Sequence, residues 1–173
     1  MTKIIKHFIL ITRHRLKVMK YCFKMKLYWQ GIVHDLSKYS LTEFISSVKY
    51  YNGKRSPIDN EKDDKGYSLA WQHHKGRNPH HWEYWIDNLG TYENKPCRIP
   101  RKYVLEMICD WIAAGQTYEK RDWTPEKMLN YFEKYRKERI FHPETLDFID
   151  DILYDMFEYG VDFTIKHLEC FEY

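Results

Sequence analysis

Residues 3–27, KIIKHFILITRHRLKVMKYCFKMKL, decide the fold class. Apolar residues recur in this stretch at spacings of three and four, and lysines fill the other face, a pattern typical of an amphipathic α-helix. The apolar line consists of Ile4, Phe8, Ile11, Val18, Cys22 and Met25. A histidine, His14, falls on the same line. We therefore predict a long helix that buries one face and a histidine with it.

Similar signals predict helices along the rest of the chain. Hydrophobic residues make up 43% of the 173 residues, with only 7 Gly and 6 Pro, which argues against disorder and against a many-turned β fold. Helices are expected over about 29–38, 41–51, 67–75 and 101–115, from 80, 125 and 143, with an end at Gly160 and a last amphipathic stretch up to Tyr173. The polar segment 52–66 is expected to be a loop. The prediction is a single all-α helical bundle over residues 1–173, with its motifs in about 10–115 and C-terminal helices in 125–173.

Charge and cysteine usage limit the classes of function. The net charge is +3, yet residues 1–34 hold eight Lys or Arg and no acid. Such a basic helix could attract phosphates or nucleic acid, although a solvated helix face is the simpler interpretation. The short apolar run at 8–11 is cut off by Arg13, and the four cysteines are scattered. We expect a cytoplasmic protein with reduced thiols and no membrane segment, and the sequence leaves homo-oligomers possible.

Polar residues at inward positions of three helices form the candidate site. They are His14, the pair His34-Asp35 and Asp110. Four of the nine histidines, His73, His74, His80 and His81, crowd into one further segment. Buried polar atoms must be hydrogen-bonded or bind a metal, and imidazole with carboxylate suits a divalent metal that keeps open positions. Taken singly, each residue could instead be a buried ion pair or a core histidine bonded to a backbone carbonyl.

The motifs together resemble a known family. His14, then HDLSK at 34–38, then the histidine-rich segment, then EMICDW at 106–111 are similar to the HD-domain metal-dependent phosphohydrolases, over roughly residues 10–115. The pattern HDLSK…HH…RNPHHW also resembles a small bacterial and phage family, and this second likeness says little about activity. The superfamily resemblance implies a helical bundle that presents one or two divalent ions, without distinguishing Mn, Fe, Mg, Zn, Co or Ni.

The resemblance implies roles for individual residues. The implied metal ligands are His14, His34, Asp35, His74, His81 and Asp110, with His80 as an alternative to His81. The implied catalytic residues are Asp35, Lys38 and His81, and the implied substrate-binding residues are Lys38, Arg77 and His80. We accordingly expect an enzyme, a phosphomonoesterase or phosphodiesterase. It would hydrolyse a phosphate ester, a nucleotide or related small molecule, with metal-bound hydroxide as the nucleophile.

Several alternatives stay open at this point. His7 competes with His14 as the first ligand, because only 20 residues separate His14 from His34. Glu43 completes a capping box with Ser40, or bonds to a ligand histidine. The same ligands could form a di-iron oxygenase centre. The metal could also be structural, in a non-catalytic module that binds nucleic acid or protein.

Overall fold

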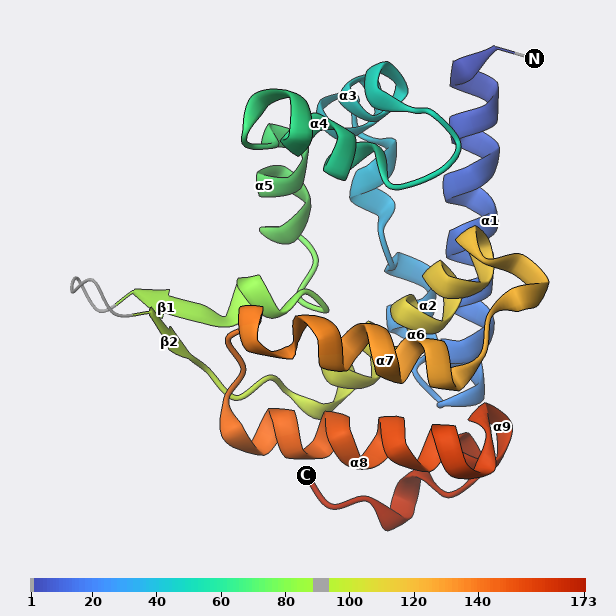
Figure 1. Ribbon diagram of the computed structural model, residues 1–173, viewed down its shortest axis with the longest axis vertical. Coiled ribbons are helices and arrows are strands. Elements are labelled where there is room, and N and C mark those ends of the chain that lie inside the picture. Colours follow the sequence, from blue (N-terminus) through green and yellow to red (C-terminus); the bar gives the residue numbers. More distant parts are fainter. Residues whose placement is uncertain (1, 89–93) are drawn as a thin grey trace.

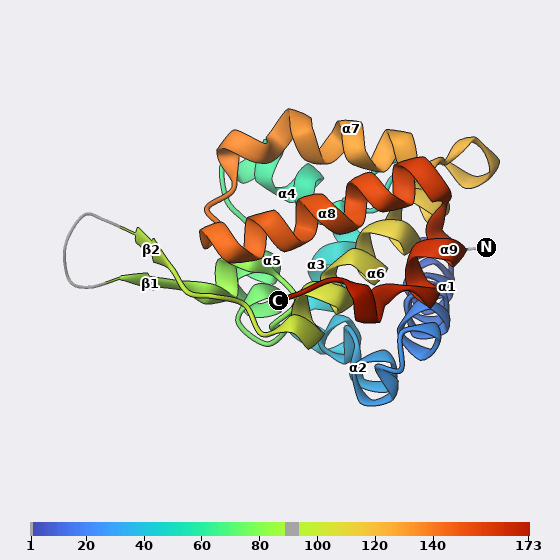
Figure 2. The same ribbon diagram turned by 90° about the horizontal axis from the view of Figure 1, so that it is seen from below.

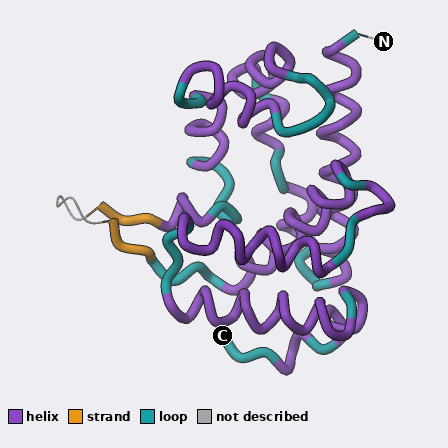
Figure 3. The backbone as a smooth tube through the Cα atoms, viewed as in Figure 1, coloured by secondary structure: helices purple, strands orange, loops and turns teal. Residues whose placement is uncertain are grey.

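The computed structural model describes residues 2–88 and 94–173, and it confirms the all-α prediction (Figures 1 and 3). In the described chain the strands form a single hairpin, in which β1 pairs antiparallel with β2. No described helix is both long enough and apolar enough to cross a bilayer. The elements are α1 Lys3–Lys24, α2 Tyr28–Val33, α3 Leu41–Tyr50, α4 Pro57–Lys65, α5 Leu69–Lys75, β1 Ile86–Asn88, β2 Asn94–Pro96, α6 Arg101–Tyr118, α7 Pro125–Tyr135, α8 Pro143–Tyr159 and α9 Val161–Lys166.

Helix α6 lies at the centre of the bundle. It packs along α1, and α7 and α8 cover another side (Figures 1 and 2). Its middle turns are buried nearly all round, as expected for a helix enclosed by others. The core that results includes Val104, Ile108 and Ile112 from α6 and Ile149 and Ile152 from α8, all fully buried. Smaller helices α3, α4 and α5 form a separate layer above this core (Figure 1).

Helix α1 confirms most of the predicted apolar line. Ile11, His14 and Val18 are buried, but Ile4 and Phe8 are 56% and 48% exposed, so the line was wrong at its N-terminal end. His7 is buried there instead, with its ring centroid 5.3 Å from that of Phe44. The first turns of α1 pack against α3 rather than against the main core, so a different face of the helix is buried there.

Helix α2 ends earlier than predicted, at Val33. His34 caps it, and Asp35 adopts a left-handed conformation with φ 55° and ψ 24°. Non-glycine residues rarely occupy this region, although Asp tolerates it better than most. The chain then forms a 3-10 turn over Leu36–Tyr39. The left-handed residue therefore breaks the expected continuous helix at the candidate site.

Arg15 on α1 holds this break in place. Its Nε donates to the carbonyl oxygen of His34 at 2.7 Å, and its Nη2 donates to that of Ile32 at 2.8 Å. The last carbonyls of a helix have no partner within the helix, so the guanidinium satisfies two groups that would otherwise need water. The first predicted helix thus positions the second.

Two other predictions were wrong. The expected loop 52–66 contains α4, where Ser56 accepts from the Ile58 amide and Gly66 ends the helix at φ 79°. The α4 segment is too polar to show an apolar period, so only its end signals marked it. The expected helix from His80 is a turn followed by a 3-10 helix, Trp82–Trp85. The predicted helix starts at Pro125 and Pro143 and the end at Gly160 were confirmed.

We expect Arg15→Met to destabilise the protein by about 1–3 kcal/mol, because two carbonyls lose a charged donor while the aliphatic stem is kept. Urea unfolding of wild type and variant measures this difference. Arg13→Met, at an exposed position of the same helix, is the matched control and should change stability by less than about 0.5 kcal/mol. Equal effects at both positions would contradict the tethering role of Arg15.

Candidate metal centre

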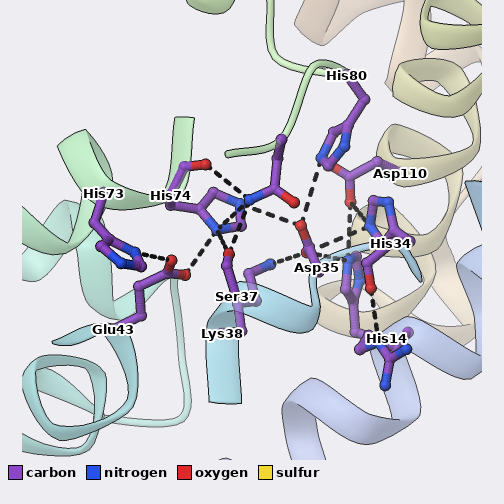
Figure 4. A network of polar contacts seen from close by, with 12 residues as sticks. His14, His34, Asp35, Ser37, Lys38, Glu43, His73, His74, His80 and Asp110 are labelled. Atoms are coloured by element: carbon purple, nitrogen blue, oxygen red, sulfur yellow. Dashed lines mark hydrogen bonds and ion pairs between the residues drawn. The ribbon is translucent and has the colours of Figure 1, made fainter. Parts of the chain in front are cut away.

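The predicted metal ligands come together around one carboxylate, that of Asp35 (Figure 4). Asp35 is fully buried at the left-handed turn after α2. His14 reaches it from α1, His34 from the end of α2, His74 from α5, His80 and His81 from the following turn, and Asp110 from α6. Five segments of the fold thus supply the cluster.

One oxygen of Asp35 faces the first group of side chains. Its Oδ2 lies 3.3 Å from His34 Nε2 and 3.9 Å from His14 Nε2. Asp110 closes the group, with Oδ1 2.8 Å from His14 Nε2. The potential ligand atoms of His14, His34, Asp35 and Asp110 all lie within 4.8 Å of one another. Two imidazoles and two carboxylates could hold one divalent ion and leave positions open.

The other oxygen of Asp35 faces the second group. Its Oδ1 lies 3.2 Å from His74 Nε2 and 3.5 Å from His80 Nε2. With His81 added, these atoms also lie within 4.8 Å of one another. The second group could hold a second ion, and the two oxygens of Asp35 are placed to bridge the pair.

Two buried glutamates orient the histidines from outside. Glu106 Oε1 lies 2.9 Å from His34 Nδ1 and 3.1 Å from His80 Nδ1, while Glu43 Oε2 lies 2.8 Å from His74 Nδ1. These contacts leave the Nε2 atoms to face Asp35, and such carboxylate–histidine pairs are common around metal ligands. His34, His80 and Glu106 form a third group of potential metal ligands, but Glu106 contacts only the Nδ1 atoms of rings whose Nε2 atoms already face Asp35.

Glu106 was missed by the sequence reasoning, and Glu43 was left between two roles. The signal for Glu106 was its position one helical turn before Asp110, on the same face of α6. Glu43 fills part of both roles, in the capping box and in the contact to a ligand histidine. Its amide donates to Ser40 Oγ at 3.4 Å, as in a capping box, while its carboxylate binds His73 and His74.

The donor atoms themselves are suited to a metal. The Nε2 atoms of His14, His34, His80 and His81 and both oxygens of Asp35 are buried, and their only close polar contacts among the described residues are ion pairs within the site, with His74, Lys38 and Asp110 included. Buried polar atoms are nearly always paired, so this concentration calls for an explanation. Imidazole nitrogens and carboxylate oxygens are ligands for divalent transition metals. The residues present therefore fit one or two such ions.

The charges of the site are strongly coupled. Burial disfavours charged His34, but the carboxylates of Asp35 and Asp110 outweigh it and raise the pKa of His34 well above its ordinary value. Burial opposes ionisation of Asp35 too, yet His34 and Lys38 hold the pKa of Asp35 well below its usual range. Burial and the neighbouring His80 lower the pKa of His81 well below its ordinary value. His81 is therefore neutral, as a ligand must be.

Lys38 belongs to the site and Arg77 does not. Lys38 Nζ lies 2.5 Å from Asp35 Oδ2, and its side chain is 25% exposed. It lines a cavity of about 210 Å³ together with His14, His81 and Asp110. Arg77 is exposed, bonds to the carbonyl of His73 and lines a different cavity of about 650 Å³, bordered by the Glu106 side of His34 and His80.

Two further histidines lie outside both ligand groups. His73 bonds to Glu43 through Nδ1 at 2.6 Å and is 20% exposed. His7 lines the 210 Å³ cavity, and burial with the nearby Lys38 lowers its pKa to about 4. The structure thus favours His14 over His7 as the first ligand. It brings both His80 and His81, and not His73, to the second group.

Comparison with known proteins identifies one family. A family model described as "Family of unknown function (DUF5662)" matches residues 3–155. No curated protein and no solved structure matches the chain. The resemblance to HD-domain phosphohydrolases therefore stays a prediction.

The coupled charges predict that metal binding strengthens as pH rises. The raised pKa values of His34 and His74 stabilise the metal-free fold at pH values below the unfolded pKa, and this contribution is lost as pH rises through the folded values. Bound metal requires neutral imidazoles, so it displaces these protons and gains affinity by about tenfold per pH unit for each proton released. Mn²⁺ should raise Tm more at about pH 8 than at about pH 5.5. A thermal shift that is equal at both pH values would contradict this expectation.

Glu106→Gln should weaken metal binding by about 10- to 100-fold, because the histidines lose the negative charge of the acceptor that orients them and makes them more basic. Competition for Mn²⁺ with a chromogenic chelator measures the affinity. Glu61→Gln is the matched control, since Glu61 is also buried but bonds to Ser68 and Lys65, away from both ligand groups. The role given to Glu106 would be untenable if the two variants bound metal equally well.

Proposed function

The chain belongs to the DUF5662 family, whose description assigns no reaction, and we propose from its own site that it is a metal-dependent phosphohydrolase acting on a phosphate ester of a small molecule. One observation carries the proposal. Asp35 offers its two oxygens to two separate groups of inward-facing ligands, with the ammonium of Lys38 beside them. Such a pairing of two ion positions with an adjacent cation suits a phosphoryl group.

Divalent ions at these two positions would lower the pKa of a water towards ~7 and withdraw electrons from a phosphoryl oxygen. The protein supplies the geometry in which this chemistry occurs. His14, His34 and Asp110 would hold one ion, His74, His80 and His81 would hold the other, and Asp35 belongs to both groups. Glu43 and Glu106 keep the rings from rotating.

Lys38 is the residue best placed to bind the substrate. Its ammonium is next to Asp35 and opens onto the 210 Å³ cavity. Burial would lower its pKa, but Asp35 and Asp110 raise that pKa above its ordinary value, so Lys38 stays protonated. A permanent positive charge there offsets the charge that builds on the phosphoryl oxygens in the transition state.

The geometry changes the role proposed for His81. Its low pKa makes the neutral ring a better ligand than a proton donor. His80, expected from resemblance as a substrate-binding residue, lies between Asp35 and Glu106 and is likewise placed to ligate. Arg77 lines the other cavity, with His34 and His80, and not the cavity that Lys38 lines.

Asp35→Asn should remove most of the metal and reduce phosphate release by at least about 100-fold, because it deletes the shared negative charge. Elemental analysis and a panel of phosphomonoesters and phosphodiesters, assayed with added Mn²⁺, measure the two effects. Asp151→Asn, at an exposed position on α8, is the control and should leave both unchanged.

Two outcomes would contradict the proposed function. Iron-bound protein that consumes oxygen and releases no phosphate would favour an oxygenase on the same ligands. A salt-dependent nucleic-acid complex that persists in Asp35→Asn, with no turnover, would favour a binding module that uses the basic face of α1.

A further inference from the structure

Helix α1 has two faces with apolar residues, and only one of them packs against the rest of the fold. The packed face turns to α6 and α3 and includes, at spacings of three and four, His7, Ile11, His14, Val18 and Tyr21. The second face lies on the opposite side of the helix, and its residues also recur at spacings of three and four: Ile5, Ile9, Thr12, Leu16, Met19 and Phe23. We name this second row the outer seam. At 1.5 Å per residue it is about 27 Å long.

The outer seam is open to solvent. Ile5, Leu16 and Phe23 are 47%, 54% and 40% exposed, and the other three residues are half-buried. The hydroxyl of Thr12 is satisfied, since it bonds to that of Tyr39 at 2.9 Å. Helix α1 lies at the edge of the molecule, where a partner can reach it (Figures 1 and 2). Single exposed apolar residues are ordinary, but a row that repeats every 3.5 residues is the pattern by which one helix packs along another.

A row of cations runs beside the outer seam. Lys6, Arg13 and Lys20 are spaced seven residues apart, each directly follows a seam residue, and all three are exposed. Among the described residues, the α1 cation that forms an ion pair is Lys24, with Asp162. Residues 1–34 contain no acid. The surface thus presents uncompensated positive charge along one side of an apolar seam.

A second copy of the chain does not complement this surface. In an antiparallel pair of helices packed along their seams, the cation row would face the same row of the other copy. In a parallel pair, it would face the positions of Phe8, Arg15 and Cys22, none of which is acidic. Like charges placed opposite one another destabilise a helix pair. The seam therefore favours a different helix, one that carries acidic residues.

Nucleic acid and lipid fit the surface less well than such a helix. Phosphates would neutralise the cation row but leave the apolar seam in water. A helix that lies on an anionic bilayer has a basic polar face on both sides of its apolar face. Here the other side of the seam meets aromatic rings instead, because Phe8 lies against Tyr39 and Phe23 against Tyr28, with ring centroids 5.7 and 5.3 Å apart.

We propose that the outer seam docks an amphipathic helix of another protein, whose apolar residues repeat every 3.5 residues and whose acidic residues face Lys6, Arg13 and Lys20. Apolar anchors at helical spacing supply the contact area, and the complementary charges fix the register and select the partner. The seam lies on the side of α1 away from His14, so the proposal is independent of the proposed function.

A synthetic peptide of three EIAALEK repeats tests the seam, because Ile and Leu form its apolar row and Glu lies on both flanks. We expect it to bind the full chain in isothermal titration calorimetry, and Leu16→Gln to increase its Kd by at least about tenfold. Leu16 is 54% exposed, so the fold should be unaffected. The matched control is Leu69→Gln on α5, where Leu69 is 64% exposed; it should leave the Kd unchanged.

Charge is tested separately from the apolar contact. Arg13→Glu combined with Lys20→Glu should weaken binding of the EIAALEK peptide by at least about tenfold and strengthen binding of a KIAALKE peptide, which has Lys on both flanks. Lys134→Glu combined with Lys137→Glu, at exposed positions in and after α7, is the control and should change neither affinity. Equal binding of the two peptides by the wild type would overturn the proposal.

The other occupants give different results. No binding of the EIAALEK peptide to the wild type would overturn the proposal, and so would a wild-type dimer, seen by analytical ultracentrifugation, that Leu16→Gln dissociates. Binding to phosphatidylserine vesicles that requires Leu16, or to duplex DNA that requires Arg13 and Lys20 but not Leu16, would contradict it if the peptide were not bound. None of these measurements uses a phosphate ester, so failure of the proposed function and failure of this proposal are distinguishable.

Discussion

The structure depends on the placement of one fully buried carboxylate, that of Asp35. A carboxylate enclosed by protein is tolerated only when positive charge and donors surround it. Here the partners come from α1, α5, α6 and the turn after α5, so the helices that carry them must meet at one point. The left-handed conformation of Asp35 and the hold of Arg15 on the end of α2 direct the carboxylate there. The packing of the helices therefore also sets the geometry of the site.

The buried charges around Asp35 also explain why the site suits metal ions. Asp35, Asp110, Glu43 and Glu106 bring four carboxylates into one region, against a single ammonium, that of Lys38. Protonated histidines balance this excess in the metal-free fold, which is the physical cause of the raised pKa values at His34 and His74. Divalent ions would supply the same positive charge while leaving the rings neutral. Protons on the histidines and divalent ions would therefore compete to neutralise the same carboxylates.

Two carboxylates of the site lie on the same enclosed helix. Glu106 and Asp110 are one turn apart on α6, and they contact His34 and His14 respectively. The middle turns of α6 are buried nearly all round, so both carboxylates are attached to an element packed by its neighbours. A site on such an element keeps its geometry better than one on loops.

The sequence alone determined the helical class, the buried face of α1 around His14, the proline-opened starts of α7 and α8, and the identity of most ligand candidates. These features depend on local periodicity and end signals, which a single chain displays directly. It did not reveal α4, which has no apolar stripe, or the left-handed turn at Asp35. The tertiary structure decided that His80 and His81 join Asp35 while His73 and Arg77 do not, and that Glu106 orients two rings. These pairings join segments up to 72 residues apart, so they follow from how the helices pack and from no pattern within any one of them.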